Sequence, residues 1–308
     1  MGDLVDPFGR VVRDLRISVT DRCNFRCTYC MPEEGVPWLP RTQILTFEEI
    51  TRIASICVGR YGFTGIRLTG GEPTIRAHIT RLVAQLAELG IDVAMTTNAA
   101  TLQHQAHDLR AAGLNRINIS LDTLDRAKFQ RMTRRDELDS VLAGIDAAID
   151  AGFAPVKINA VIERGVNDDE LVDLARFGRE RGVEVRFIEF MPLDATDEWQ
   201  RSTVVGQDEI VARLSAVWDL EQVPARGAAP ADRWRYLDGG GLVGVIPTVT
   251  KPFCGDCDRI RLTADGQLRT CLFATDEFDL RAALRSGESD DQIAARIEAA
   301  VGTKWAGH

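Results

Sequence analysis

The chain has 308 residues, of which 45% are hydrophobic, and 37 basic against 46 acidic side chains give a net charge of −9. This composition is typical of a folded globular protein and excludes collagen-like, mucin-like and disordered chains. The acidic balance argues against binding to nucleic acid or an anionic membrane, although a local basic pocket can still hold a small anion. The sequence shows neither a transmembrane stretch nor the apolar run of a signal peptide, so we expect a cytoplasmic protein.

Six short, β-branched runs alternate with longer amphipathic segments. The runs span residues 15–20, 65–69, 91–96, 116–121, 156–162 and 183–190. The clearest helix is predicted over 47–61, beginning at a Thr46…Glu49 capping box, and Asn167…Glu170 is expected to begin another helix in the same way. Alternating strands and helices pair in parallel through right-handed crossovers. We therefore predict an α/β fold with a six-unit partial TIM-type barrel, short of the eight units of a full barrel.

The pattern changes after the sixth run. A helix is expected near 207–217, then a Pro/Ala/Gly-rich break at 226–232 and two alternating runs at 233–237 and 242–246. We predict two domains, a partial barrel over residues 1–220 and a small C-terminal domain over 221–308.

Six of the seven cysteines form two sets with the spacings C-x3-C-x2-C and C-x2-C-x13-C. The first triad is Cys23, Cys27 and Cys30, and the second triad is Cys254, Cys257 and Cys271. Structural zinc prefers four ligands, and none of the four histidines stands at a short spacing from either set. Three thiolates instead suit a four-iron cluster in which the fourth iron stays free. Cys57 lies on the apolar face of the 47–61 helix and is expected to be a buried core residue.

The sequence around the second triad contains a strong hairpin signal. Asp265-Gly266 stands between runs at 259–262 and 268–271. A two-residue turn there pairs residues whose numbers add up to 531, which places Cys271 opposite Ile260 and three residues from Cys257. All three sulfurs are then expected to reach one metal centre.

The first triad, with Tyr29 before its last cysteine, resembles the defining motif of the radical S-adenosylmethionine (SAM) superfamily. Gly70-Gly71-Glu72-Pro73 resembles the GGE segment of that superfamily. Further segments narrow the resemblance to the GTP 3',8-cyclases of molybdenum cofactor biosynthesis, and the similarity covers residues 8–305. These segments are 96–98 (TTN), 120–122 (SLD), 187–191 (FIEFM) and 257–261 (CDRIR).

The resemblance implies a radical SAM lyase that converts GTP to (8S)-3',8-cyclo-7,8-dihydroguanosine 5'-triphosphate. Its cofactors would be two 4Fe-4S clusters and SAM. In such enzymes the first cluster binds SAM and reduces it to a 5'-deoxyadenosyl radical, which takes a hydrogen atom from ribose C3' before the sugar attacks C8 of guanine. The implied partners are GTP, an electron donor, a functionally linked downstream cyclic pyranopterin monophosphate synthase and a second copy in a homodimer.

The resemblance also assigns site residues position by position. The first triad would be catalytic and hold the first cluster, and the second triad would hold the second cluster. The implied SAM contacts are Tyr29, Gly71, Ser120 and Met191. The implied GTP contacts are Arg16, Arg67, Thr96, Lys157, Arg259, Ile260 and Arg261. Independently, active sites of parallel α/β folds form at the C-terminal strand ends, where the first triad, the GGE turn and several of these residues lie.

Two groups of cations have competing explanations. Lys157 and Asn159 share one strand face, which is either a solvated edge or, if buried, a place where the lysine needs an anion. Arg259 and Arg261 likewise share a face beside Cys257, and they either belong to ordinary strand surface or hold a polyphosphate through charge-assisted hydrogen bonds.

The sequence departs from the family at three places. Ala99 stands where glycine is usual, and we expect a local backbone adjustment. Gly65 stands where some members have lysine, which removes one phosphate contact. The family typically ends in a Gly-Gly tail, whereas this sequence ends Lys-Trp-Ala-Gly-His. Either the given chain is truncated or the protein lacks the tail, and in both cases we expect less efficient cyclisation.

Two other functions compete with the cyclase. One is a radical SAM enzyme whose second cluster serves a peptide or another substrate, and the Arg259/Arg261 pair argues against it. The other is a non-catalytic iron–sulfur electron carrier or zinc-binding module. Such a protein does not need six α/β units arranged around one active-site opening.

Overall fold

The six expected barrel strands are present and run parallel to one another. The computed structural model describes residues 2–192, 199–224 and 227–307. The strands are β1 (Asp14–Ser18), β2 (Gly65–Thr69), β3 (Asp92–Thr97), β4 (Arg116–Ser120), β5 (Lys157–Ile162) and β6 (Glu184–Glu189). Each pairs in parallel with the next along the chain, so the predicted partial α/β barrel is confirmed.

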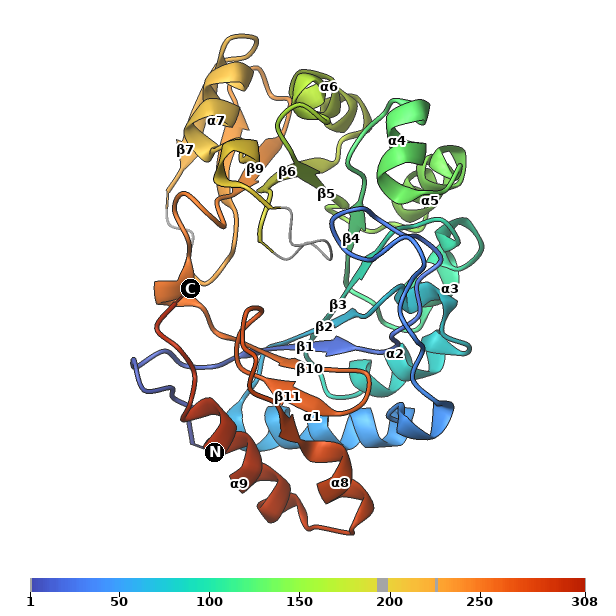
Figure 1. Cartoon of the computed structure of the whole chain (residues 1–308), viewed down its shortest axis with the longest axis vertical. Helices are drawn as coiled ribbons and strands as arrows, with labels where there is room; N and C mark the ends of the chain where they lie inside the picture. The colour runs from blue at the N-terminus through green and yellow to red at the C-terminus, as the bar shows by residue number, and fades with distance from the viewer. Residues whose placement is uncertain (1, 193–198, 225–226, 308) are drawn as a thin grey trace.

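Helices cover the outer face of these strands (Figure 1). They are α1 (Phe47–Tyr61), α2 (Ile79–Ala87), α3 (Ala106–Ala111), α4 (Arg126–Thr133), α5 (Leu138–Asp150) and α6 (Leu171–Arg181). The hydrophobic core lies between the two layers, where strand residues such as Leu68 meet helix residues such as Ile53 and Leu82 with no exposed surface. This leaves the inner face of the sheet for polar side chains.

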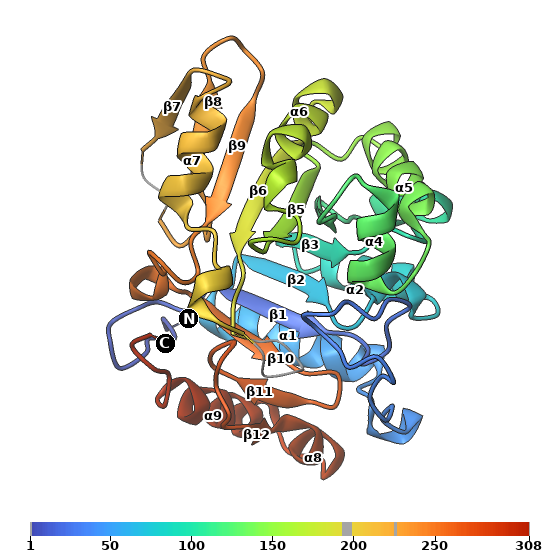
Figure 2. The ribbon, with the colours of Figure 1, turned by 45° about the horizontal axis from the view of Figure 1, so that its top comes forward.

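The chain after β6 extends the same sheet at both edges (Figure 2). At one edge, β9 (Leu242–Ile246) pairs in parallel with β6, and β8 (Asp232–Tyr236) and β7 (Leu220–Val223) follow antiparallel, with α7 (Gln207–Ser215) nearby. At the other edge, β10 (Arg259–Leu262) pairs in parallel with β1. Then come β11 (Gln267–Arg269), β12 (Phe278–Asp279), α8 (Leu280–Arg285) and α9 (Asp290–Val301).

The sheet order is β12-β11-β10-β1-β2-β3-β4-β5-β6-β9-β8-β7. Within the described ranges, residues on both sides of the predicted boundary near 220 therefore belong to one sheet, and the division into two domains stays a prediction. Among those residues, no helix has the length and apolarity needed to cross a membrane.

Helix α1 forms as the sequence predicts. Thr46 Oγ1 accepts a hydrogen bond from the backbone N–H of Glu49, the Glu49 carboxylate accepts one from the Thr46 N–H, and Gly62 ends the helix in the left-handed region. Cys57 is fully buried in the core, as expected, and this burial raises its thiol pKa to about 12.

The capping box predicted at Asn167 and Glu170 is wrong. Both side chains are buried, and neither caps α6. The Glu170 carboxylate accepts hydrogen bonds from the Thr123 hydroxyl and the Leu124 N–H, and the Asn167 amide donates to the carbonyls of Asp122 and Val161. The buried loop groups that bind these two side chains have no water as an alternative partner, so they bind the side chains in place of the helix N-terminus.

The predicted hairpin between β10 and β11 exists, but its register is shifted by one residue. Arg261 pairs with Arg269 and Leu262 with Leu268, so paired numbers add up to 530. The loop has three residues: a turn closes from Gly266 N–H to the Thr263 carbonyl, and Gly266 then adopts φ +83°. This is a type I turn followed by a bulge, and it moves Cys271 toward the level of Arg259 instead of Ile260.

The backbone adjustment expected at Ala99 stays a prediction. Ala99 adopts the left-handed conformation, with φ +61°. The space for its methyl group comes from Gly144 of α5, where an added Cβ would lie only 3.0 Å from the Ala99 Cβ and 2.3 Å from its carbonyl oxygen. The chain thus accommodates alanine by a small residue on the helix packed against it.

Candidate active site

The first triad lies in the loop that follows β1. Cys30 and Met31 donate backbone hydrogen bonds to the Cys27 carbonyl, so the last two cysteines share one turn. Burial raises the pKa of all three thiols, and the neighbouring thiol Cys30 adds to the effect at both Cys23 and Cys27. These sulfurs are therefore poor free thiolates, and a bound cationic metal centre would supply the charge that stabilises them.

Tyr29 connects the triad loop to the barrel. Its hydroxyl donates a 2.7 Å hydrogen bond to Asp122, which also accepts one from the Val161 N–H at 2.8 Å. Burial raises the pKa of Asp122 to about 6, although these hydrogen bonds oppose the shift. Sequence analysis quoted Asp122 only as part of a motif, and its role as the acceptor for Tyr29 becomes visible only in the fold.

The Gly70-Gly71 turn lies directly against the triad loop. Gly71 and Glu72 donate backbone hydrogen bonds to the carbonyls of Thr20 and Arg22, both at 2.8 Å. A Cβ at position 71 would lie 2.0 Å from the Arg22 carbonyl oxygen, and Gly70 has φ +143°. Glycine is thus required because backbone meets backbone here.

Replacing Gly71 by alanine is expected to lower the free energy of unfolding by about 1–3 kcal/mol, since rigid backbone cannot yield to the added methyl group. Gly59→Ala is the matched control: position 59 lies in α1 with nothing within 4 Å of an added Cβ, so that variant should gain about 0.5–1 kcal/mol. Denaturant unfolding of the cluster-free chains measures both. Equal stability of the two variants would contradict the close approach.

Glu72 organises the neighbouring strand ends from a buried position. Its carboxylate accepts hydrogen bonds from the Thr97 hydroxyl and the Asn98 N–H, each at 2.6 Å, and from the N–H and hydroxyl of Thr74. The Asn98 amide in turn donates to Asn24 in the triad loop at 2.7 Å. Sequence analysis assigned no role to the Glu72 carboxylate, although the GGE motif was the available signal.

Three arginines form a row across the inner face of the sheet. Arg261 of β10, Arg16 of β1 and Arg67 of β2 are direct register partners on adjacent strands. Burial lowers the pKa of each guanidinium, and the neighbouring arginines lower it further. The Asp14 carboxylate raises the pKa of Arg16 and Arg67 and so offsets part of this shift. Positive charges gathered in a low-dielectric interior indicate a site for an anion.

The opposite strands add further cations. Burial lowers the pKa of Lys157 to about 8, and the nearby Arg186 and Arg116 contribute to the shift. Lys157 is half-buried, and β5 pairs with β4 on one side and β6 on the other, so Lys157 does not lie at an edge of the sheet. Arg186 is also buried, and it pairs with Glu184 at 2.6 Å. No motif in the sequence marks it, because it is a single charged residue within an apolar run.

Several buried polar atoms on this inner face have no hydrogen-bond partner within the described part of the chain. They are Arg67 Nε and Asn159 Oδ1, together with Gln207 Oε1 elsewhere; Arg16 Nε and Asp14 Oδ1 make no hydrogen bond either, but they form an ion pair with each other at 3.3 Å. A buried polar atom without a partner costs free energy, so this group indicates a bound ligand or water. Thr96 and Ser120, at or near the C-terminal ends of β3 and β4, are half-buried beside them.

The second triad comes together at a single pocket. Its three cysteines line the pocket with Met191 and with the Arg259 and Arg261 side chains. Arg259 is buried, donates to the Ala228 carbonyl and stacks over the Phe253 ring at 4.8 Å. The Ile260 side chain instead points into the hydrophobic core and is fully buried, which leaves only its backbone for a substrate.

Neither triad is arranged to hold a single ion. Within residues 2–192, 199–224 and 227–307, no group of three or more His, Cys, Asp or Glu side chains has the geometry to bind one metal ion. No disulfide joins any two of the seven cysteines, all of which lie within the described residues. A four-iron cluster binds each thiolate through a different iron, so it needs only three protein ligands, whereas structural zinc prefers four.

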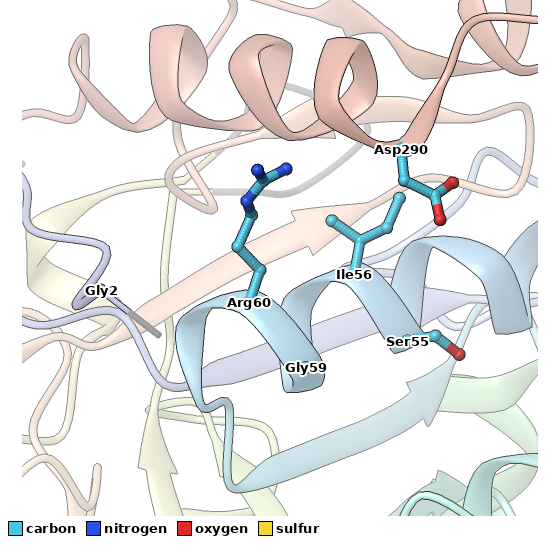
Figure 3. A pocket seen from close by; sticks show the side chains of 6 residues that line it. All are labelled: Gly2, Ser55, Ile56, Gly59, Arg60 and Asp290. Atoms are coloured by element: carbon cyan, nitrogen blue, oxygen red, sulfur yellow. The ribbon is translucent and has the colours of Figure 1, made fainter.

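Another pocket lies outside the barrel, between α1, α9 and the N-terminal segment (Figure 3). It is lined by Gly2, Ser55, Ile56, Gly59, Arg60 and Asp290. Its two charged side chains are already paired, Arg60 with Asp291 and Asp290 with Arg52. It therefore offers no charge to a ligand.

Comparisons with known proteins agree with this geometry. The radical SAM superfamily model matches residues 17–178, and the model for Molybdenum Cofactor Synthesis C matches residues 183–308. GTP 3',8-cyclase 2 of Mycobacterium tuberculosis is 50% identical, covering 100% of this chain and 87% of that protein. The chain belongs to the GTP 3',8-cyclase family. The Corynebacterium glutamicum member of this family is 48% identical over 99% of the chain and 84% of its own length.

Solved structures with lower identity share the fold of this cyclase family member. SuiB of Streptococcus suis bound to S-adenosylmethionine has a TM-score of 0.62 at 14% identity, over 94% of this chain and 68% of that one. The anSMEcpe structure with bound AdoMet also has a TM-score of 0.62, at 13% identity, over 87% and 74%.

Proposed function

We propose that this chain is a GTP 3',8-cyclase that converts GTP to (8S)-3',8-cyclo-7,8-dihydroguanosine 5'-triphosphate in the first step of molybdenum cofactor biosynthesis. The observation that carries the proposal is the row Arg261, Arg16 and Arg67, which begins at the second triad and follows the inner face of the sheet. Membership of the family supports the reaction, and the buried cations support a polyphosphate substrate.

The two triads fit two 4Fe-4S clusters. The first triad would hold the cluster that binds SAM, and the second triad would hold the other one. Bound there, the first cluster and SAM supply the radical that takes a hydrogen atom from the ribose. The protein contributes placement, because the Tyr29–Asp122 bond and the glycine turn fix the triad loop against the barrel.

SAM is assigned to the mouth between the first triad and the strand ends. The proposed SAM contacts come from four separate segments: Tyr29 is bonded to Asp122 just after β4, Gly71 follows β2, Ser120 ends β4 and Met191 follows β6. Gly71 leaves room for close approach to backbone, and Met191 follows β6 and lines the second-triad pocket. This arrangement would place SAM between the first triad and the bound nucleotide.

The GTP triphosphate is assigned to the cations. Arg16, Arg67, Arg261 and Lys157 would hold it through charge-assisted hydrogen bonds, while Thr96 and the Ile260 backbone would contact the rest of the nucleotide. Arg259 lines the second-triad pocket, but its bond to the Ala228 carbonyl would have to be shared with a phosphate.

Anaerobic reconstitution with iron and sulfide tests the proposal. With SAM, a reductant and GTP, the chain is expected to form 5'-deoxyadenosine and the cyclised nucleotide, as measured by chromatography and mass spectrometry. Guanosine should be a far poorer substrate, because it lacks the groups that the buried cations bind. SAM cleavage without conversion of GTP would favour a peptide-modifying enzyme, and zinc without inorganic sulfide would favour a non-catalytic module.

The proposal extends to cellular context. An electron donor is needed to reduce the first cluster, and a cyclic pyranopterin monophosphate synthase would consume the product. A reducing cytoplasm would keep all seven cysteines as thiols for cluster assembly.

A further inference from the structure

Lys304 is a buried lysine beside the second triad. The residue follows α9 in the chain and is only 3% exposed. The ammonium donates hydrogen bonds to the carbonyl oxygens of Arg259 at 2.6 Å and Thr270 at 2.7 Å, and it lies 3.9 Å from the Cys257 sulfur. Arg259 is two residues from Cys257, and Thr270 is adjacent to Cys271. The ammonium thus joins the two chain segments that carry these cysteines.

Arg10 makes the matching contact to the remaining cysteine. Its guanidinium donates to the Cys254 carbonyl at 2.6 Å and to the carbonyls of Trp305 and Ala306. The buried Asp6 carboxylate holds this guanidinium at 2.5 Å. An added Cβ at Gly307 would lie 3.0 Å from the Cys254 Cβ, so the 304–307 segment passes directly over this cysteine.

Burying a lysine costs free energy unless its charge is compensated. Two neutral carbonyls compensate it only in part, and no carboxylate within the described residues forms an ion pair with Lys304. A cluster bound through thiolates would provide the missing negative charge.

We propose that Lys304 and Arg10 are positioning residues of the second triad: together they fix the spacing of its three cysteines, and the Lys304 ammonium stabilises the negative charge of the metal centre. The inference rests on the proposed assignment of a cluster to this triad. A cation at this distance favours the reduced, more negative state of such a cluster, so it raises the midpoint potential.

The test uses a parent chain in which Cys23, Cys27 and Cys30 are replaced by alanine, so that only the second cluster contributes. After anaerobic reconstitution, we expect about four irons per parent chain. Lys304→Met should release iron to a chelator about ten-fold faster than the parent. Lys304→Gln keeps a donor without the charge, so it should retain the cluster with a lower midpoint potential. Lys304→Arg should restore the parent potential.

Lys251→Met is the matched control. Lys251 is exposed, precedes Cys254 by three residues and pairs with Asp208, so its loss should change neither quantity. Two results would overturn the inference. One is a Lys304→Gln variant whose midpoint potential equals that of the parent, and the other is a Lys304→Arg variant whose potential is as low as that of Lys304→Gln. The Gln and Arg variants decide the matter if Lys304→Met does not fold. A parent that binds no iron would instead overturn the cluster assignment itself.

Discussion

Cys27→Ser is expected to abolish 5'-deoxyadenosine formation from SAM. Cys27 is the middle ligand of the first triad, and its sulfur interacts electrostatically with both Cys23 and Cys30. A serine hydroxyl is a hard ligand that ionises far less readily than a thiol, so it does not replace a thiolate on iron. Because SAM needs a cluster with one open iron, losing one of three ligands removes the reactive centre. Anaerobic chromatography of reaction mixtures measures the product.

Cys57→Ala provides the control for this experiment. Cys57 is a buried cysteine of α1 in the same core, but it belongs to neither triad. Its loss should cost some stability through a small cavity and leave SAM cleavage intact. Cleavage by Cys27→Ser at the rate of the unmodified chain would remove the first triad from the mechanism. An equal loss in both variants would show that the effect is one of folding.

The secondary structure could be predicted well where local signals and core burial agree. The six parallel strands have apolar runs that must be buried on a covered face, and Thr46 with Glu49 caps α1 through purely local contacts. The hairpin shows the limit of such signals. Asp265-Gly266 predicts a turn correctly, but the choice between a two-residue and a three-residue loop depends on the conformation that Gly266 adopts.

Buried polar residues were harder to predict than strands. Asn167 and Glu170 match a capping box in sequence, yet the fold brings buried loop groups to their side chains. The side chains form hydrogen bonds with these groups instead of capping the helix. The cysteine spacings indicated metal ligands because thiolates at short separations have few other uses in a reducing compartment. The partners of those ligands, such as Asp122 for Tyr29 and Lys304 for Cys257, come from distant segments and carry no spacing signal.

Arg261→Ala is expected to weaken GTP binding by roughly ten- to a hundred-fold. The side chain lines the second-triad pocket and begins the row of three arginines. Burial lowers its pKa to about 10, so it remains charged at neutral pH. Removing one charge-assisted hydrogen bond costs about 1.5–3 kcal/mol, which corresponds to that loss of affinity. Binding of SAM, which we assign to other residues, should stay near normal.

Arg269→Ala separates phosphate binding from a general effect on the hairpin. Arg269 is the register partner of Arg261 on β11, but its side chain is 39% exposed and pairs with Glu277. Its loss should leave GTP affinity unchanged, since exposed ion pairs contribute little. Equilibrium binding of GTP, guanosine and SAM under anaerobic conditions measures all three ligands. If Arg261→Ala weakens guanosine as much as GTP, or weakens neither, then Arg261 does not bind the phosphates and a peptide substrate becomes the better explanation of this pocket.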